Sequence, residues 1–114
     1  MFKIGEFSKL VRVSPRMLRH YEKCGLLYPA EIDRFTGYRQ YSAAQIPLLT
    51  QIVSLRDMGF GIDEIGDILP HMDDTAYMDR VLLEKAETVR AAMQQERFKL
   101  QLLEMARSKL TEEK

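Results

Sequence analysis

The 114-residue sequence predicts a mainly α-helical fold, in which short helices and one small β-hairpin precede a single long helix. Three observations lead to this prediction. Apolar residues recur three and four positions apart over most of the chain, which is typical of helices with one buried face. The turn signal "DRFTG" is followed by the aromatic segment "YRQYS", which favours a hairpin. From Tyr77 to Lys109 there is no Gly or Pro, so that one helix can continue without interruption.

The first helix is predicted over residues 4–12, and its apolar residues share one face: Ile4, Phe7, Leu10 and Val11. A tight turn of about four residues follows. Ser14 and Pro15 then mark the start of a second helix, because serine accepts hydrogen bonds from free N–H groups and proline fits the first helical position. Gly25 ends this helix. Two short helices joined in this way have the dimensions of a helix-turn-helix.

The second helix is predicted to turn its positive charge outward. With Leu18 and Tyr21 packed inward, the remaining faces carry Arg16, Arg19, His20 and Lys23. Arg16 lies in the first turn, where recognition helices reach base edges, and Arg19 and Lys23 are expected to meet phosphates. The alternative is a solvated cationic face on an ordinary helical hairpin.

The charge of the chain is unevenly distributed, although its net charge is zero. Residues 1–42 contain eight Lys/Arg and four Asp/Glu, whereas the other 72 residues contain nine and thirteen. A basic front favours binding to a polyanion, although a difference of this size also arises by chance. No apolar run is long enough to span a membrane and no signal peptide is recognisable. We therefore expect a cytoplasmic protein, without an internal disulfide because Cys24 is the single cysteine.

A β-hairpin of roughly ten residues is predicted after Pro29. It carries Arg34 near its tip, and Tyr38 and Arg39 on its second strand. A basic hairpin directly after a helix-turn-helix is the plan of a winged helix. In that plan Arg39 would bind a phosphate, and Tyr38 would donate a hydrogen bond or pack on a sugar.

Two more helices complete the predicted first domain, residues 1–70. Ser42 and Gln45 fit a capping box at the start of a strongly apolar helix. Pro47 lies just inside that helix and predicts a kink or a shortened start, because it cannot donate a backbone hydrogen bond. A short amphipathic helix follows the turn at "MGFG" and stops at Pro70.

The remaining residues are predicted to form a hinge loop, 71–76, and a dimerisation helix, 77–114. Nine positions between 82 and 110 alternate by four and three, the spacing of a coiled-coil seam. Glu96 and Arg107 interrupt the seam, and its other seven residues are apolar: Leu82, Ala86, Val89, Met93, Leu100, Leu103 and Leu110. A lone helix cannot bury such a stripe on itself, so we expect a homodimer. The alternative is a monomer in which the stripe packs back on the first domain.

The sequence offers little for other kinds of chemistry. No nucleophile–base pair or glycine-rich phosphate loop is recognisable, so we predict that the protein is not an enzyme. His71, Asp73 and Asp74 lie close together in sequence, but such an acidic loop is usually solvated rather than a metal site. Cys24 is expected to be a small buried hydrophobe. We predict no cofactor and no metal.

Three segments together resemble the MerR family of bacterial transcriptional regulators: "IGEFSKLVRVSPRMLRHYEKCGLLYP", "GYRQYS" and "LRDMGFGIDEIGDIL". They cover about the first 70 residues, and the long helix continues the pattern. The combination of Arg-x-x-Arg-x-Tyr, Gly-Leu-Leu-x-Pro and Gly-Tyr-Arg-x-Tyr at these separations is highly specific. The resemblance implies a winged-helix domain that binds promoter DNA as a homodimer, with the long helices paired antiparallel and RNA polymerase at the same promoter.

The resemblance also assigns roles to individual residues. Arg16 and Arg19 match the two arginines of the family's recognition helix, Tyr21 matches its second tyrosine, and His20 stands where many members have the first. Tyr38 and Arg39 match the wing residues that hold the DNA backbone. The full predicted DNA-binding set is Ser14, Arg16, Arg19, His20, Tyr21, Lys23, Arg34, Tyr38 and Arg39.

The mechanism that the resemblance implies is distortion of a near-palindromic promoter site. Family members bend and untwist DNA between two promoter elements that are spaced too far apart for polymerase. Two other functions remain open at this point: an architectural, excisionase-like DNA-binding protein, and a simple repressor. The effector is unknown, and the sequence fits either a small member of the family or a piece of a longer regulator with a sensor domain.

Overall fold

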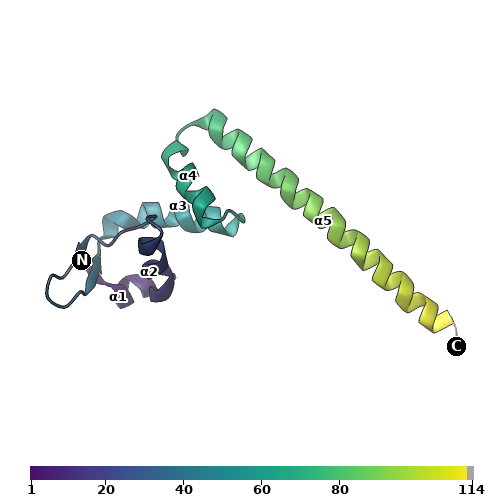
Figure 1. Cartoon of the computed structure of the whole chain (residues 1–114), viewed down its shortest axis with the longest axis horizontal. Coiled ribbons are helices and arrows are strands. Elements are labelled where there is room, and N and C mark those ends of the chain that lie inside the picture. Colours follow the sequence, from purple (N-terminus) through teal and green to yellow (C-terminus); the bar gives the residue numbers. More distant parts are fainter. Residues whose placement is uncertain (113–114) are drawn as a thin grey trace. The chain divides into compact units, whose positions relative to one another are not determined.

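The computed structural model describes residues 1–112, and the chain divides between Met72 and Asp73 into two compact units (Figure 1). The second unit is the long helix α5 (Thr75–Glu112). The elements of the first unit are, in order, β1 (Phe2–Lys3), α1 (Ile4–Val11), α2 (Pro15–Lys23), β2 (Glu31–Ile32), β3 (Arg39–Tyr41), the 3₁₀ turn η1 (Ala43–Gln45), α3 (Ile46–Asp57), α4 (Ile62–Ile68) and the 3₁₀ turn η2 (Leu69–His71). The predicted fold class, mainly helical with a small wing and a long last helix, is confirmed.

Helices α1 and α2 form the predicted helix-turn-helix. α1 ends at Arg12, which takes the left-handed conformation with a φ of 58°. The Oγ of Ser14 accepts a hydrogen bond from the backbone N of Met17 at 3.1 Å, so the predicted N-cap of α2 is confirmed. Leu18 and Tyr21 of α2 are buried, as expected.

The apolar face of α1 is less buried than its spacing predicts. Phe7 is fully buried, but Leu10 is 54% exposed. The reason is that Leu10 lines an open apolar groove of about 410 Å³ between α1 and α3, together with residues such as Leu49 and Val53. The periodicity located α1 correctly, but it did not show how much of the apolar face of α1 is covered by α3.

The wing is part of a three-stranded antiparallel sheet with the order β1-β3-β2. The predicted hairpin is formed by β2 and β3, with Ile32 opposite Arg39. The N-terminal strand β1 was not predicted, because two residues are too few for a strand pattern; it pairs Phe2 with Tyr41. The ring of Tyr41 stacks on Phe7 with a centroid distance of 4.7 Å. This contact fixes the wing sheet to α1.

Helices α3 and α4 supply a further part of the core, with Leu49, Ile52, Leu55, Ile65 and Ile68 all buried. The predicted capping box is present at η1, where the backbone N of Ser42 donates to Oε1 of Gln45 at 2.9 Å. Pro47 is the second residue of α3. The regular α-helix therefore starts only at Ile46, after the 3₁₀ turn, which is the shortened start that was predicted. Proline is tolerated at this position because the first N–H groups of a helix have no acceptor within it.

Helix α5 begins at Thr75, two residues earlier than expected, because Oδ1 of Asp74 caps it by accepting from the backbone N of Tyr77 at 3.1 Å. Since η2 continues to His71, the stretch without helix is shorter than the expected hinge loop, 71–76. Residues 113 and 114 of the predicted dimerisation helix lie outside the described residues. In residues 1–112 no helix has both the length and the apolar character needed to cross a bilayer.

Candidate nucleic-acid interface

The outward face of α2 is cationic, as its sequence predicted. Arg16, Arg19, His20 and Lys23 are all exposed, because the buried side of the helix is used by Leu18 and Tyr21 (a pair three residues apart). Arg16 is the second residue of the helix and therefore lies in its first turn.

Beside this helix lies a cleft of about 640 Å³, lined by Lys3, Ile4, Gly5, Glu6, Lys9, Arg19, Gly37, Tyr38 and Arg39. Its walls come from the start of the chain, from α1, from α2 and from the wing. Lys3, Lys9 and Arg19 bring positive charge to it from three different elements. Its carboxylate, Glu6, accepts a hydrogen bond from the backbone N of Lys3 at 3.0 Å and thereby caps α1. A cleft of this charge suits a chain of phosphates.

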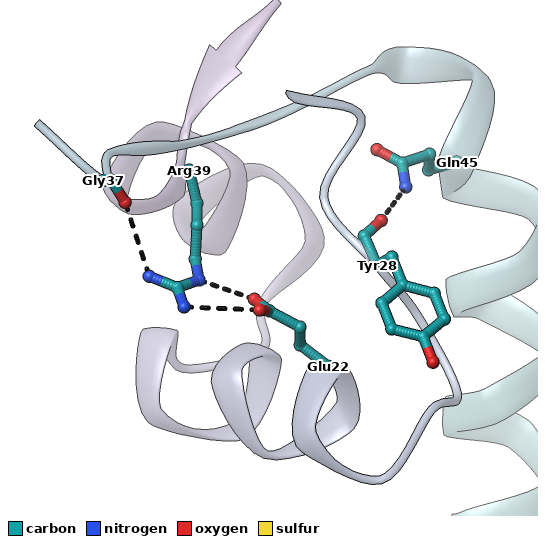
Figure 2. A network of polar contacts seen from close by, with 5 residues as sticks. All are labelled: Glu22, Tyr28, Gly37, Arg39 and Gln45. Carbon is teal, nitrogen blue, oxygen red and sulfur yellow. Dashed lines mark hydrogen bonds and ion pairs between the residues drawn. The ribbon is translucent and has the colours of Figure 1, made fainter. Parts of the chain in front are cut away.

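Arg39, which the sequence predicted to bind phosphate, is occupied by a carboxylate of the protein (Figure 2). Its Nε donates to Oε1 of Glu22 at 2.5 Å and its Nη2 to Oε2 at 3.3 Å. The hydrogen bond to Glu22, and then the charge of Glu22, raise the pKa of Arg39. The two side chains are 35% and 18% exposed. Glu22 was absent from the predicted set, since no local pattern links it to a residue 17 positions later.

The wing tip is a turn closed by local hydrogen bonds. Oδ1 of Asp33 accepts hydrogen bonds from the backbone N of Phe35 and of Thr36, at 2.8 and 2.9 Å. These two bonds, with Thr36 contributing more, lower the pKa of Asp33. Gly37 closes the turn with a φ of 73°, in the region that favours glycine. Arg34, Phe35 and Tyr38 are among the exposed side chains of this turn.

Tyr21 is in the core rather than on the surface. It is 1% exposed, and its hydroxyl accepts a hydrogen bond from Nη1 of Arg56 at 3.1 Å. A buried hydroxyl that is already bonded is not positioned to contact a duplex. Tyr21 is therefore not part of the proposed interface.

Cys24 was expected to be buried, and this expectation is wrong. The residue is exposed because α2 ends at Lys23, so that Cys24 caps the helix instead of facing the core. Its Sγ lies 3.7 Å from Nε2 of His20, a contact that the spacing of four residues could have revealed. His71, Asp73 and Asp74 form no metal cage: within residues 1–112 there is no group of three or more His, Cys, Asp or Glu that could hold an ion.

Comparison with known proteins identifies the family. The model of the family described as "MerR HTH family regulatory protein" matches residues 2–72, more than half of the chain. The chain belongs to the MerR family. The match covers all the elements that line the cleft, and it includes both Glu22 and Arg39. MerR proteins are transcriptional regulators and not enzymes, as the sequence predicted.

Individual MerR proteins show how far the similarity extends. The transcriptional activator TipA of Streptomyces coelicolor is 36% identical over 81 residues, which are 69% of this chain and 32% of TipA. The N-terminal part of Mta, the Bacillus subtilis multidrug transporter activator, has a TM-score of 0.76 at 29% identity, over 93% of this chain and 97% of that structure. EcmrR in its DNA complex within EcmrR-RPo has a TM-score of 0.66 at 40% identity, over 77% and 33%. The chain thus spans about a third of the length of TipA.

Proposed function

We propose that this MerR protein is a sequence-specific regulator of transcription that binds promoter DNA as a homodimer. The observation that carries the proposal is the position of the cationic cleft directly beside the exposed face of α2. A recognition helix can enter a major groove only if the neighbouring surface accepts the phosphates on either side of that groove. Here both surfaces are built from one compact unit.

The exposed residues divide into two roles. Arg16, in the first turn of α2, reads a base edge, since arginine forms two hydrogen bonds with guanine. Arg19, Lys3 and Lys9 in the cleft bind phosphates, and Lys23, Arg34, His20 and Tyr38 extend the contact along the backbone. Ser14 holds the start of α2 in place through its cap.

The homodimer is supported by the seam of α5. Val89, Met93, Leu100 and Leu103 are each between 46% and 63% exposed in the single chain. Aliphatic side chains at seam spacing become buried when a second helix packs on them. A second copy of the chain, paired antiparallel, supplies that helix and places two recognition helices on one duplex.

The relatives support the remaining parts of the proposal. TipA is a transcriptional activator, and EcmrR has been seen on DNA in EcmrR-RPo. By analogy we place RNA polymerase at the same promoter, and the protein in the cytoplasm. The division between Met72 and Asp73 supports a DNA-binding domain that ends near residue 70, and a separate dimerisation helix that begins at Thr75, with the hinge in the short stretch between His71 and Thr75. An effector would act by changing the angle at that hinge.

DNA binding by this cleft can be tested with a duplex that the wild-type protein selects from a random-sequence library. Affinity for this duplex and for a scrambled one is measured over a series of salt concentrations. Arg19→Ala should reduce the slope of log K against log salt by about 0.9 for each phosphate that the variant no longer binds. Arg16→Ala should weaken discrimination between the two duplexes by about 1–3 kcal/mol.

Lys109→Ala is the matched control, because Lys109 is an exposed cation outside both the cleft and the seam. It should leave slope and discrimination unchanged. If Arg16→Ala and Arg19→Ala also behave like the wild type, the interface is not on α2. If the wild type selects no sequence at all, the proposed function is wrong.

A further inference from the structure

An ion pair joins the recognition helix to the wing. Glu22 belongs to α2 and Arg39 to β3, and the two nitrogens of the guanidinium edge meet the two carboxylate oxygens at 2.5 and 3.3 Å (Figure 2). The third nitrogen, Nη1, points back to the carbonyl oxygen of Gly37 at 3.5 Å, inside the wing turn. One planar group therefore bridges the helix and the turn of the wing.

The surroundings of the pair make it a specific contact. Glu22 is 18% exposed in its side chain, whereas a typical surface carboxylate is free in water. It follows Tyr21, which is buried, so its backbone is fixed by the core. Two parallel hydrogen bonds between arginine and a carboxylate define both distance and orientation, which a lysine could not do.

The pair also changes the charge that a duplex meets. Arg39 lines the cleft, but its charge is compensated by Glu22. The positive charge that a duplex meets in the cleft therefore comes mainly from the other lining cations, Lys3, Lys9 and Arg19. A guanidinium that satisfies a carboxylate of the protein gains little by exchanging it for a phosphate. Arg39 therefore adds little to the attraction between the cleft and the backbone.

We propose that Glu22 is a positioning residue for DNA binding: it locks Arg39, and with it the wing, at a fixed distance from the recognition helix. The proposal rests on the proposed function and deepens it. Because this ion pair holds the recognition helix and the wing in a fixed arrangement, both contact the duplex as one rigid body. A DNA site whose shape fits this arrangement is then bound in preference to other sequences. Arg39 acts on DNA through the position of the wing and not as a phosphate ligand.

Arg39→Lys separates geometry from charge. The variant keeps the positive charge but cannot form the two-pronged contact. The same selected and scrambled duplexes serve as probes, and the full chain is used. If Arg39 positions the wing, the ratio of the affinities for the two duplexes should fall by roughly tenfold, which corresponds to a loss of about 1.4 kcal/mol. The salt dependence of binding should not become weaker than that of the wild type. A ratio and slope equal to those of the wild type would overturn the proposal.

Glu22→Gln tests the other half of the pair. It removes the carboxylate charge and releases Arg39, so binding to the scrambled duplex should become tighter and its salt slope steeper by up to about 0.9 per protomer. The ratio between the duplexes should fall as in Arg39→Lys. Glu31→Gln is the control, since it removes the same charge from an exposed position of β2 in the same wing. A ratio kept at the wild-type value in Glu22→Gln contradicts the lock.

A double-mutant cycle completes the test. Arg39→Gln and the double variant with Glu22→Gln should lower the ratio by the same factor as Glu22→Gln alone, because all three remove one interaction. If Arg39 binds a phosphate directly, Arg39→Gln instead lowers the salt slope by about 0.9 and Glu22→Gln leaves the ratio intact. Thermal melting followed by circular dichroism identifies any variant that fails to fold. In that case the affinity ratio measured for Arg39→Lys decides whether the proposal holds. Failure of the wild type to discriminate would refute the proposed function rather than the lock.

Discussion

Tyr41 has an unusual environment at the scale of a single residue. Its side chain is fully buried against Phe7, yet among residues 1–112 no hydrogen-bond partner reaches its hydroxyl. Burial is the main cause that raises the pKa of Tyr41, and the negative charge of Glu22 raises it further. An unpaired buried hydroxyl normally costs stability, so the residue is a direct test of the packing around the wing sheet.

Tyr41→Phe should leave the free energy of unfolding at pH 7 unchanged or raise it by up to about 1 kcal/mol, because it removes a polar group without a partner. Above pH 10 the advantage of the variant should grow. The folded-state pKa of Tyr41 is raised, so wild-type stability is fully present below the unfolded value and is lost as the pH rises through the folded one. Denaturant titrations at pH 7 and near pH 10.5 measure both effects.

Tyr38→Phe serves as the control for this prediction, since Tyr38 is 68% exposed. Its removal should change stability little at either pH. A decrease in stability of more than about 1 kcal/mol at pH 7 in Tyr41→Phe would mean that the hydroxyl makes a favourable interaction and that the wing sheet packs differently.

Helix α5 raises a different question at the scale of an element. It is a 38-residue helix, and every described residue from 86 onward is exposed in the single chain. Its first turn is capped by Asp74, but a cap contributes only about 1 kcal/mol, which is small for a helix of this length. We therefore expect another helix to cover the apolar seam of α5 in solution.

Val89→Asp combined with Leu103→Asp should dissociate or unfold the protein, because burying an unpaired charge in a seam costs several kcal/mol. Sedimentation velocity at micromolar concentration measures the result, with the wild type expected as a dimer. Gln94→Asp with Gln101→Asp is the matched control, since it adds two charges to the same helix outside the seam. A wild type that sediments as a monomer would exclude the coiled coil.

At the scale of the whole molecule, the homodimer that we propose must fit its two DNA-binding units, joined by one helix pair, to one operator. A dimer with twofold symmetry selects a near-palindrome, and the centre of the site lies outside both grips. Bending or untwisting that centre costs on the order of 1–6 kcal/mol, so deformable sequences are favoured there. Phosphate contacts from Arg19, Lys3 and Lys9 in the clefts of both protomers would offset this cost.

A promoter on which the protein acts by distortion should become independent of it when the spacer between the promoter elements is shortened by about two base pairs. Transcription in vitro, with and without the protein, measures this. The control is the same deletion in a promoter that lacks the operator. Straight DNA in the complex, together with a promoter of ordinary spacing, would identify the protein as a simple repressor that blocks polymerase.

Sequence patterns were sufficient to locate the features of this protein that depend on neighbours along the chain. Ser14 and Pro15 start α2 by satisfying local donors, Gly37 provides a backbone conformation for the wing turn, and the four-and-three spacing places α5. These features follow from hydrogen bonds and side-chain faces within a few residues, which a sequence pattern contains directly. The outward position of Arg16 and Arg19 follows in the same way.

The contacts that each of these parts makes depend on how the chain packs in three dimensions. In the folded chain β1 pairs with β3, and the hydroxyl of Tyr21 accepts a hydrogen bond from Arg56. Cys24 is exposed to solvent, and Arg39 forms an ion pair with Glu22 instead of being free to bind a phosphate. Each of these contacts joins residues whose separation along the chain carries no signal, or depends on where a helix ends to within one residue. Such contacts are set by the packing of the core, because a partner is chosen by its distance in space and not in sequence.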